Sequence, residues 1–410
     1  MSVEITFIRH GQTTGNSSGR WQGHTNGPLT DHGRDQARRL GARLADEHFD
    51  LVLSSDLERA RDTALALGQD VETDERWREP FFGTWEDCTT EEILAHDREG
   101  LAGLLAGEDV ALGGGERLSE VFARMSDALD DAVARVGSGS IAIVSHGMSL
   151  LTLLSGLLTS KRPSPLGILG NTAITRWVVD DGRHRMKVYN DDTHLERPSE
   201  FIVGRQDSDP IMYLVRHGQT PSNTEHRWQG HLDGQLNDEG RRQAKLVAGV
   251  LPEFDALYAS PLSRAADTAG AVAERQGLEV SFDDRLKEIH FGNWEGLTTG
   301  EIAEKFPEES REFFNGHDVR RGGTGETFDE VQARIRESLG EIAAGHPAHT
   351  IGVVAHGGVT RAWAGDVLAL PYESRGRIAI LDNTGFARVA FGSRGPQIVS
   401  WNLTPHLEES

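Results

Sequence analysis

Short apolar runs alternate with longer amphipathic segments along the whole chain. In the first half these runs are EITFI, DLVLSS and SIAIVSH, and in the second half they are PIMYLVR, DALYAS and TIGVVAH. Runs this short and this continuous are typical of parallel strands that are buried on both faces. We therefore expect residues 4–8, 50–55, 140–146, 210–216, 255–260 and 350–356 to form strands.

The spacing of apolar residues between these runs predicts helices. After Leu29, the segment TDHGRDQARRLGARL places Ala37, Leu40 and Leu44 on one helical face, with Thr30 or Asp31 available as the N-cap. A strand, a helix and a further strand make a βαβ unit. Each half of the chain holds only two or three such units, too few for an eight-stranded barrel. We predict an α/β fold of three-layer α/β/α domains, each with a mostly parallel open sheet.

The whole pattern occurs twice, at an interval of about 207 residues. FIRHGQTTGN near the start is matched by LVRHGQTPSN, so that His10 lies 207 positions before His217. A repeat this long is a complete domain. We predict two tandem domains, residues 1–197 (copy one) and 210–410 (copy two), joined by a polar linker over residues 198–209. Small insertions shift the interval for the other pairs, which are Arg59 and Arg264, Glu79 and Glu288, His146 and His356, and His194 and His406.

Composition narrows the function classes. The chain has 410 residues, one cysteine, and a formal net charge of −22 that divides almost evenly between the halves. A lone cysteine excludes a disulfide framework, and the first residues lack the basic and apolar regions of a secretory signal, so we expect a soluble, cytoplasmic protein. An acidic surface repels nucleic acid and anionic lipid, so we expect neither as a partner. The most apolar stretch, Met148 to Leu158, is too short to span a bilayer and predicts a buried helix.

Cationic and reactive side chains follow the predicted strands. Arg9 and His10 follow the first run, Arg59 lies one turn after the second, and His146 ends the third. Because the carboxyl ends of parallel strands meet at one edge of a sheet, these side chains should converge. Guanidinium groups match the oxygens of a phosphoryl group, and a neutral imidazole can attack phosphorus and hold the phosphoryl covalently. The matching residues of copy two are Arg216, His217, Arg264 and His356.

Each copy also offers a carboxylic acid that could protonate a leaving group. Glu79 and Glu288 stand at equivalent positions before a Phe-Gly turn, in ERWREPFFGTWE and DRLKEIHFGNWEG. We expect apolar side chains at the turn to favour the protonated carboxyl. A solvated surface acid is the alternative interpretation. Pro80, which stands where copy two has Ile289, could also misplace Glu79.

Motifs in a fixed order connect these residues to a known family. RHGQT, the helix after it, SxLxRAxxTA, ExxFGxWE and a late SHG or AHG occur in both copies. This combination resembles the histidine phosphatase superfamily, in its phosphoglycerate mutase-like branch, over nearly the whole chain twice. The resemblance implies a phosphoric monoester hydrolase with a phosphohistidine intermediate, no metal and no cofactor.

The same resemblance implies a role for each matching residue. His10 and His217 would be the phosphorylated nucleophiles, and Glu79 and Glu288 the proton donors. A small phosphorylated substrate is the expected partner. The phosphate-binding residues would be Arg9, Asn16, Arg59 and His146 in copy one, and Arg216, Asn223, Arg264 and His356 in copy two.

Differences between the copies leave alternatives open. Residues 89–110 of copy one are acidic to apolar, whereas the insertion of copy two carries Lys305, His317, Arg320 and Arg321, where a second anionic group could bind. Phosphoglycerate mutase-type transfer in copy two is therefore an alternative to hydrolysis. Another is that one copy is a non-catalytic phospholigand-binding module. The duplication also leaves open an intrachain pseudo-dimer or a homo-oligomer.

Overall fold

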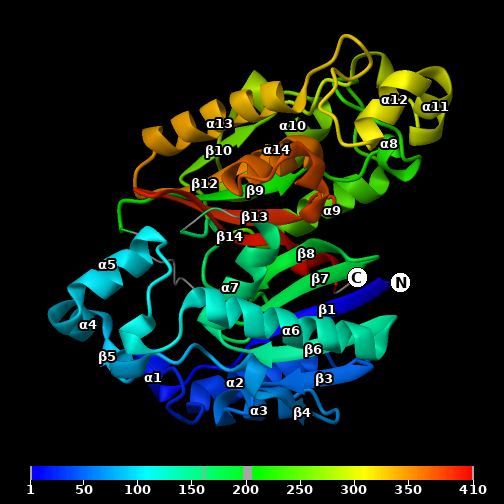
Figure 1. The fold of residues 1–410 in the computed structure, drawn as a ribbon. Helices are drawn as coiled ribbons and strands as arrows, with labels where there is room; N and C mark the ends of the chain where they lie inside the picture. Colours follow the sequence, from blue (N-terminus) through cyan, green and yellow to red (C-terminus); the bar gives the residue numbers. More distant parts are fainter. Residues whose placement is uncertain (1, 160, 162, 197–205, 409–410) are drawn as a thin grey trace. The chain divides into compact units, whose positions relative to one another are not determined.

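The chain consists of two α/β units. The computed structural model describes residues 2–159, 161, 163–196 and 206–408 (Figure 1). Contacts within the chain divide it into residues 1–203, which hold copy one, and residues 204–410, which hold copy two. The tandem arrangement is thus confirmed. Residues 198–205 of the predicted linker lie outside the described residues, so its bounds stay a prediction.

A mostly parallel sheet forms the centre of the first unit. Strands β1, β6, β3 and β4 pair in parallel, and β7 pairs antiparallel with β1 and β8. The predicted strands of copy one are confirmed as β1, β3 and β6, whereas β7 and β8 were not predicted. The strands lie in the order β8 (Arg183–Asp191), β7 (Ile174–Asp180), β1 (Ser2–Arg9), β6 (Gly139–Ser145), β3 (Leu51–Ser54) and β4 (Glu72–Thr73).

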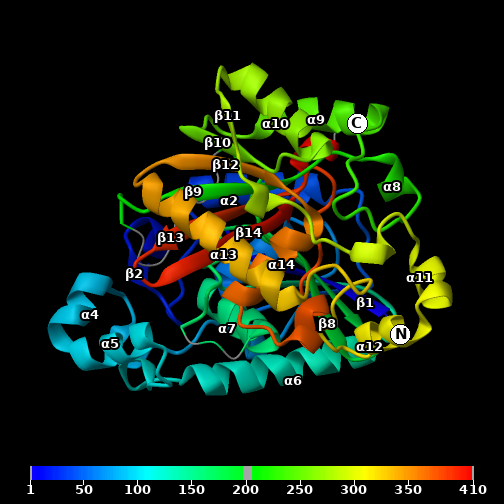
Figure 2. The ribbon, with the colours of Figure 1, turned by 90° about the horizontal axis from the view of Figure 1, so that it is seen from above.

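Helices cover both faces of this sheet (Figure 2). Ile8, Val52 and Val144 belong to one apolar cluster with Leu40 of α2, while Ile143, next to Val144 in β6, is also fully buried. Strands that are buried on both sides require the continuous apolar runs seen in the sequence. The helices are α1 (Thr14–Ser17), α2 (Asp31–Arg43), α3 (Glu58–Leu65), α4 (Thr90–His96), α5 (Arg98–Ala106), α6 (Leu118–Val136) and α7 (Gly147–Leu158). A small separate sheet pairs β2 (Arg20–Trp21) with β5 (Cys88–Thr89).

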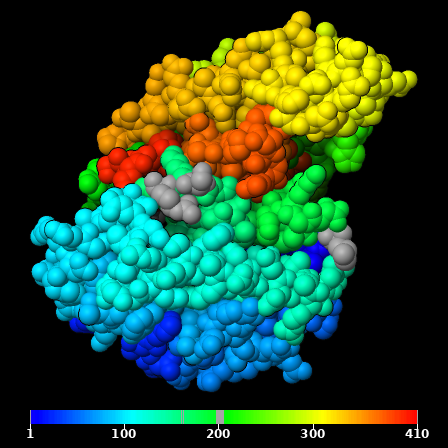
Figure 3. Space-filling view, viewed as in Figure 1, coloured from blue at the N-terminus to red at the C-terminus, as the bar shows by residue number. Residues whose placement is uncertain are grey.

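The second unit repeats this architecture. Strands β10, β11, β12 and β9 pair in parallel, and β13 pairs antiparallel with β9 and β14. The strand order is β11 (Val280–Phe282), β10 (Ala256–Ala259), β12 (Thr350–Ala355), β9 (Ile211–Arg216), β13 (Phe386–Gly392) and β14 (Gly395–Leu403). The helices are α8 (Pro221–Thr224), α9 (Asp238–Val250), α10 (Ser263–Gln276), α11 (Thr299–Lys305), α12 (Pro307–Phe314), α13 (Phe328–Gly345) and α14 (Gly357–Val367). In this unit, α11 and α12 lie at the surface (Figure 3).

Two helices were predicted in detail. α2 begins after Thr30, whose hydroxyl accepts the main-chain N–H of Gly33 (2.9 Å), and its residues Ala37 and Leu40 are buried. α7 matches the predicted apolar helix, and its buried residues include Leu150, Leu153, Leu154 and Leu158. In the part of the chain that the structure describes, no helix has both the length and the apolar character needed to cross a membrane.

Candidate active site

The predicted nucleophile of each copy lies where a central strand ends. β1 ends at Arg9, and the next residue, His10, is 3% exposed and donates its main-chain N–H to Ser145 O (2.9 Å) at the end of β6. His217 follows β9 in the same way, with its N–H bonded to Ala355 O (3.0 Å). Both copies therefore carry a buried histidine at the carboxyl edge of the sheet.

The main chain holds one ring nitrogen of this histidine. His10 Nδ1 lies 2.7 Å from Gly11 O. Because a carbonyl oxygen only accepts, Nδ1 carries the proton, and the lone pair of the neutral ring is at Nε2. His217 Nδ1 lies 2.7 Å from Gly218 O, which requires the same tautomer. The geometry therefore selects Nε2 as the nitrogen that can react.

The surroundings keep both imidazoles neutral. Burial lowers the pKa of His10 well below 6.5, and the charges of Arg59 and Arg9 lower it further. Burial and the two arginines of copy two have the same effect on the pKa of His217. A neutral imidazole is the form that can attack an electrophile.

The second histidine of copy one stands beside the first. The ring centroids of His10 and His146 are 5.0 Å apart. Arg59 Nε donates to His146 Nδ1 (3.1 Å), so the other ring nitrogen, Nε2, carries the proton and donates to Ser55 Oγ (2.9 Å). Burial and Arg59 lower the pKa of His146 well below 6.5. The positive charge of the site therefore comes from its arginines, and His146 is a neutral member.

Copy two differs at one contact of this pair. The ring centroids of His217 and His356 are 5.1 Å apart, and His356 Nε2 lies 2.8 Å from Ser260 Oγ. However, Arg264 Nε and His356 Nδ1 are both buried without a hydrogen-bond partner among the described residues. The bond that joins Arg59 to His146 in copy one therefore has no counterpart between Arg264 and His356 in copy two.

Main-chain carbonyl groups hold the arginines. Arg59 donates to Thr25 O (2.9 Å) and Gly23 O (2.7 Å), and Arg9 Nη1 donates to Leu169 O (2.6 Å). Burial lowers the pKa of Arg59 to about 10, so this guanidinium stays charged at neutral pH. In copy two, Arg264 donates to the carbonyls of Leu232 and Gly230, and Arg216 to that of Leu381.

Asn16 is tied to the nucleophile through a second asparagine. It lies in α1, and its Oδ1 accepts from Thr13 N (3.1 Å) and Asn171 Nδ2 (3.2 Å). The same amide of Asn171 donates to His10 O (2.9 Å). Asn171 was not predicted, although an Asn-Thr pair occurs at the equivalent place in copy two. The matching residues there are Asn223, Asn383 and His217, with distances of 3.1 Å.

The carboxyl group of Glu79 lies at the N-terminus of α7. Its Oε1 and Oε2 accept from Met148 N (3.2 Å) and Ser149 N (3.1 Å). The predicted apolar surroundings are therefore wrong, because both oxygens face main-chain N–H groups at the positive end of a helix. In copy two, the carboxyl of Glu288 accepts at 3.0 Å from the N–H groups of Gly358 and Val359 in α14.

Pro80 does not displace the acid, since the carboxyl groups of Glu79 and Glu288 have equivalent helix partners. One contact differs. Ile289 N donates to Glu288 Oε1 (2.8 Å), whereas Pro80 has no N–H to donate. The two acids therefore lie in equivalent places, but the carboxyl of Glu288 accepts one more main-chain hydrogen bond than that of Glu79.

A half-buried ion pair that the sequence analysis missed contacts the main chain of each acid. Arg124 donates to Arg78 O (2.9 Å) and Glu79 O (3.2 Å), and its Nε lies 2.8 Å from Glu116 Oε1. The signal was available, because Arg124 and its counterpart are separated by the same interval as His146 and His356. In copy two the contacts are made by Arg334 with Lys287 O, Glu288 O and the carboxylate of Glu326.

The basic insertion of copy two is bonded within the protein. Arg321 is 2% exposed, its Nη1 lies 2.9 Å from Asp318 Oδ1, and its guanidinium lies over the ring of Tyr372. Arg320 Nη2 lies 2.5 Å from Glu330 Oε1. Guanidinium groups that are already paired with carboxylates give no support to a second anion site here.

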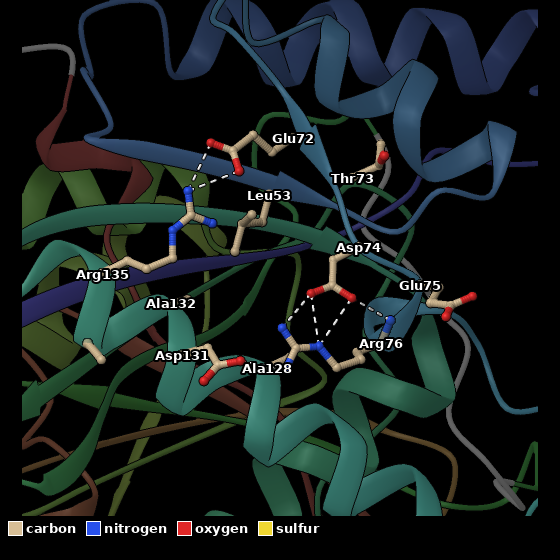
Figure 4. Close-up of a pocket in the computed structure, with 11 residues that line it drawn as sticks. Leu53, Glu72, Thr73, Asp74, Glu75, Arg76, Ala128, Asp131, Ala132 and Arg135 are labelled. Carbon is tan, nitrogen blue, oxygen red and sulfur yellow. Dashed lines mark hydrogen bonds and ion pairs between the residues drawn. The ribbon is translucent and has the colours of Figure 1, made fainter.

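A hollow of about 740 Å³ opens elsewhere on the first unit (Figure 4). It lies along β4 and α6, where Arg76 pairs with Asp74 (2.7 Å) and Arg135 with Glu72 (2.9 Å). None of the predicted site residues lines it. Over the described residues, no group of three or more His, Cys, Asp or Glu side chains could hold a metal ion.

Comparison with known proteins identifies the family. The profile of the histidine phosphatase superfamily (branch 1) matches residues 5–192 and 212–404. Phosphoserine phosphatase 1 of Hydrogenobacter thermophilus is 35% identical over 201 residues, which are 48% of this chain and 94% of that protein. The metal-independent phosphoserine phosphatase of Arabidopsis thaliana is 41% identical over 154 residues, 36% of this chain and 65% of that protein. Glucosyl-3-phosphoglycerate phosphatase of Mycobacterium tuberculosis is 34% identical over 189 residues, 44% of this chain and 84% of that protein.

Two matched regions cover most of the chain, and each contains the histidine, arginine and glutamate cluster described above. The chain therefore belongs to branch 1 of the histidine phosphatase superfamily, and it is a phosphatase with two copies of the family's domain.

Proposed function

We propose that each copy hydrolyses phosphomonoesters through a phosphohistidine at Nε2 of His10 or His217. The observation that carries this proposal is the bond from the ring Nδ1 to the following main-chain carbonyl, which leaves Nε2 unprotonated. Arg59 and its counterpart in copy two supply the charge that binds the phosphoryl oxygens beside that nitrogen.

The first step transfers the phosphoryl group to the enzyme. The Nε2 lone pair of His10 attacks phosphorus, the N–P bond forms, and the bond from phosphorus to the ester oxygen breaks. The carboxyl of Glu79 must carry a proton in the substrate complex, and the leaving oxygen takes this proton and departs as an alcohol. Arg9 and Arg59 balance the charge on the phosphoryl oxygens throughout.

The second step releases inorganic phosphate. Glu79, now a carboxylate, accepts a proton from water, whose oxygen attacks phosphorus as the N–P bond breaks. His10 leaves as the neutral imidazole because its pKa is low, and the site returns to its starting state. His217 and Glu288 perform the same two steps in copy two.

We favour hydrolysis over mutase-type transfer in copy two, and two active copies over one. A mutase must keep a bisphosphate bound, and the arginines considered for that role are paired with Asp318 and Glu330. A non-catalytic copy would be free to lose its nucleophile, arginines or acid. Both copies keep all of them in matching positions.

We propose small phosphorylated metabolites as the substrates. Phosphoserine and glucosyl-3-phosphoglycerate, which appear in the names of relatives, are the first compounds to test. The panel should also contain 3-phosphoglycerate and sugar phosphates, because every phosphomonoester presents the same dianion to the arginines.

The test is to trap phosphohistidine by rapid acid-free denaturation and to measure phosphate release, both in EDTA. The proteins are the wild type, His10→Ala, His217→Ala and the double variant. We expect each single variant to keep one phosphohistidine and part of the activity. The double variant should have neither phosphohistidine nor activity.

Other outcomes would change the proposal in defined ways. Loss of all activity in either single variant would make one copy a binding or structural partner. If the phosphoryl group passes to a second substrate and is not released as inorganic phosphate, the copy that is still active in that variant would be a phosphotransferase.

A further inference from the structure

Each copy contains a histidine that the mechanism does not use, and one ring nitrogen of this histidine is buried without a hydrogen-bond partner among the described residues. His194 follows β8, and its Nε2 lies 3.0 Å from Thr172 Oγ1. His406 follows β14, in the turn Pro405–Leu407, and its Nε2 lies 2.9 Å from Thr384 Oγ1. The same contact thus occurs twice, between residues separated by the same interval in the chain.

The hydrogen-bond directions define what this histidine does. Thr172 Oγ1 lies 2.7 Å from Asn171 O, which only accepts, so the threonine hydroxyl donates there. His194 must then donate to Thr172 Oγ1 from Nε2. Its Nδ1 is buried without a partner among the described residues. Burial lowers the pKa of His194 to about 4, so the ring is a neutral donor at pH 7.

The histidine in copy two has the same state. Thr384 Oγ1 lies 2.6 Å from Asn383 O, and His406 Nδ1 is likewise buried and unpartnered in the described part of the chain. Burial lowers the pKa of His406 to about 4. Each ring is therefore aimed at one threonine oxygen.

That threonine has a strained backbone. Thr172 has φ of 57° and Thr384 has φ of 59°, in the left-handed region that β-branched residues avoid. In this conformation Thr172 N donates to Arg9 O (3.0 Å), while the preceding Asn171 donates its side-chain amide to His10 O (2.9 Å). The strained threonine and the asparagine before it therefore donate two hydrogen bonds to the main-chain oxygens of the nucleophile loop, Arg9–Gln12.

We propose that His194 and His406 are positioning residues for the nucleophiles His10 and His217, an inference that rests on the proposed function. Each histidine holds a left-handed threonine through one N–H···O bond. The threonine in turn directs its neighbouring asparagine at the main chain of the nucleophile and at Asn16 or Asn223. Loss of the donor lets the threonine relax, and Nε2 of the nucleophile, His10 or His217, then moves out of line with the phosphorus that it attacks.

The test uses the full chain with one copy inactivated. In the His217→Ala parent, His194→Met removes the donor, and His194→Gln keeps an N–H at a similar reach. We expect His194→Met to lower kcat at least about tenfold with KM changed less, because misplacement affects attack more than phosphate binding. His194→Gln should restore most of kcat. The exposed His32→Met serves as a control that leaves kcat unchanged.

For copy two, His406→Met and His406→Gln are made in the His10→Ala parent. Thermal unfolding is measured for every variant, and Thr172→Ala against Thr172→Ser provides a second donor-acceptor pair should His194→Met not fold. Thr172→Ala should then lower kcat and Thr172→Ser preserve it.

The inference is overturned if His194→Met keeps the kcat of its parent, or if His194→Gln loses as much as His194→Met. A parent that forms no phosphohistidine would instead contradict the proposed function of that copy. The two failures are therefore distinguishable.

Discussion

At the residue scale, His10 is buried away from water and lies close to the positive charges of Arg59 and Arg9. Both lower its pKa, and the bond from Nδ1 to Gly11 O keeps Nε2 as the bare nitrogen. We predict that ¹⁵N NMR of the ring shows a neutral imidazole throughout pH 8 to 6. Arg59→Met should raise the pKa of His10, because it removes one of the charges that lower it, and should leave His217 unchanged. A wild-type His10 that titrates near 6.5 would contradict this account.

Glu79 yields a second prediction at this scale. A glutamine has no proton to give to a leaving alkoxide, although its carbonyl can still accept from the first turn of α7. In the His217→Ala parent, Glu79→Gln should lower kcat/KM for alkyl phosphates about 10²- to 10⁴-fold, because kcat/KM reports formation of the phosphohistidine and not its later hydrolysis. For a phenyl phosphate with an acidic leaving group the loss should be much smaller, since that group departs without a proton. Equal losses on both substrates would make Glu79 structural.

At the element scale, the N-terminus of α2 fits directly against the nucleophile loop. A Cβ added to Gly33 would lie 2.0 Å from the main-chain oxygen of Gln12. We predict that Gly33→Ala lowers the free energy of unfolding by about 1–3 kcal/mol, because a main-chain atom cannot move aside. Denaturant titration measures this loss, and phosphohistidine formation at His10 should slow with it.

A glycine in an open part of α9 is the matched control. Nothing lies within 4 Å of a Cβ added to Gly249, which is exposed. Gly249→Ala should therefore raise the free energy of unfolding by about 0.5–1 kcal/mol through helix propensity. A similar loss in both variants would show that the close approach at Gly33 does not matter.

The sequence predicted those elements whose pattern is local. The apolar runs gave β1, β6 and β9, and Thr30 marked the start of α2. The antiparallel strands β7 and β8 did not show in the pattern, since residues such as Arg176 interrupt their apolar positions. Contacts across long intervals, such as Arg124 with Glu79 O, are set by the packing of helices on the sheet and have no local signal.

For the site residues, the internal repeat provided the signal. Residues that recur at strand ends, such as His10 and Arg59, could be selected from one sequence. The surroundings of Glu79 were predicted wrongly, because adjacent Phe residues suggested apolar neighbours, while the helix that approaches its carboxyl comes from 69 positions away at Met148. Arg321 was misread because a charge in a sequence does not reveal that its partner Asp318 already neutralises it.

At the scale of the whole molecule, the duplication places several neutral histidines with lowered pKa values in one chain. The pKa values of His10, His146, His217 and His356 lie well below 6.5, and those of His194 and His406 lie near 4. The folded chain therefore binds fewer protons than the unfolded chain between pH 6.5 and 4. The free energy of unfolding should fall as pH decreases through this window and be insensitive to these groups above it.

His406 isolates one contribution to this acid sensitivity. With a pKa near 6.5 unfolded and about 4 folded, it should account for a loss of about 2 kcal/mol at pH 5. His406→Gln removes the titrating group and keeps a donor for Thr384, so its unfolding free energy relative to wild type should improve by that amount between pH 7.5 and pH 5. Urea unfolding at the two pH values measures the change, and His194→Gln should shift in the same direction. If the difference in unfolding free energy between His406→Gln and wild type stays constant with pH, the ring has the same pKa in the folded and the unfolded chain. The contact with Thr384 would then persist when the imidazole is charged.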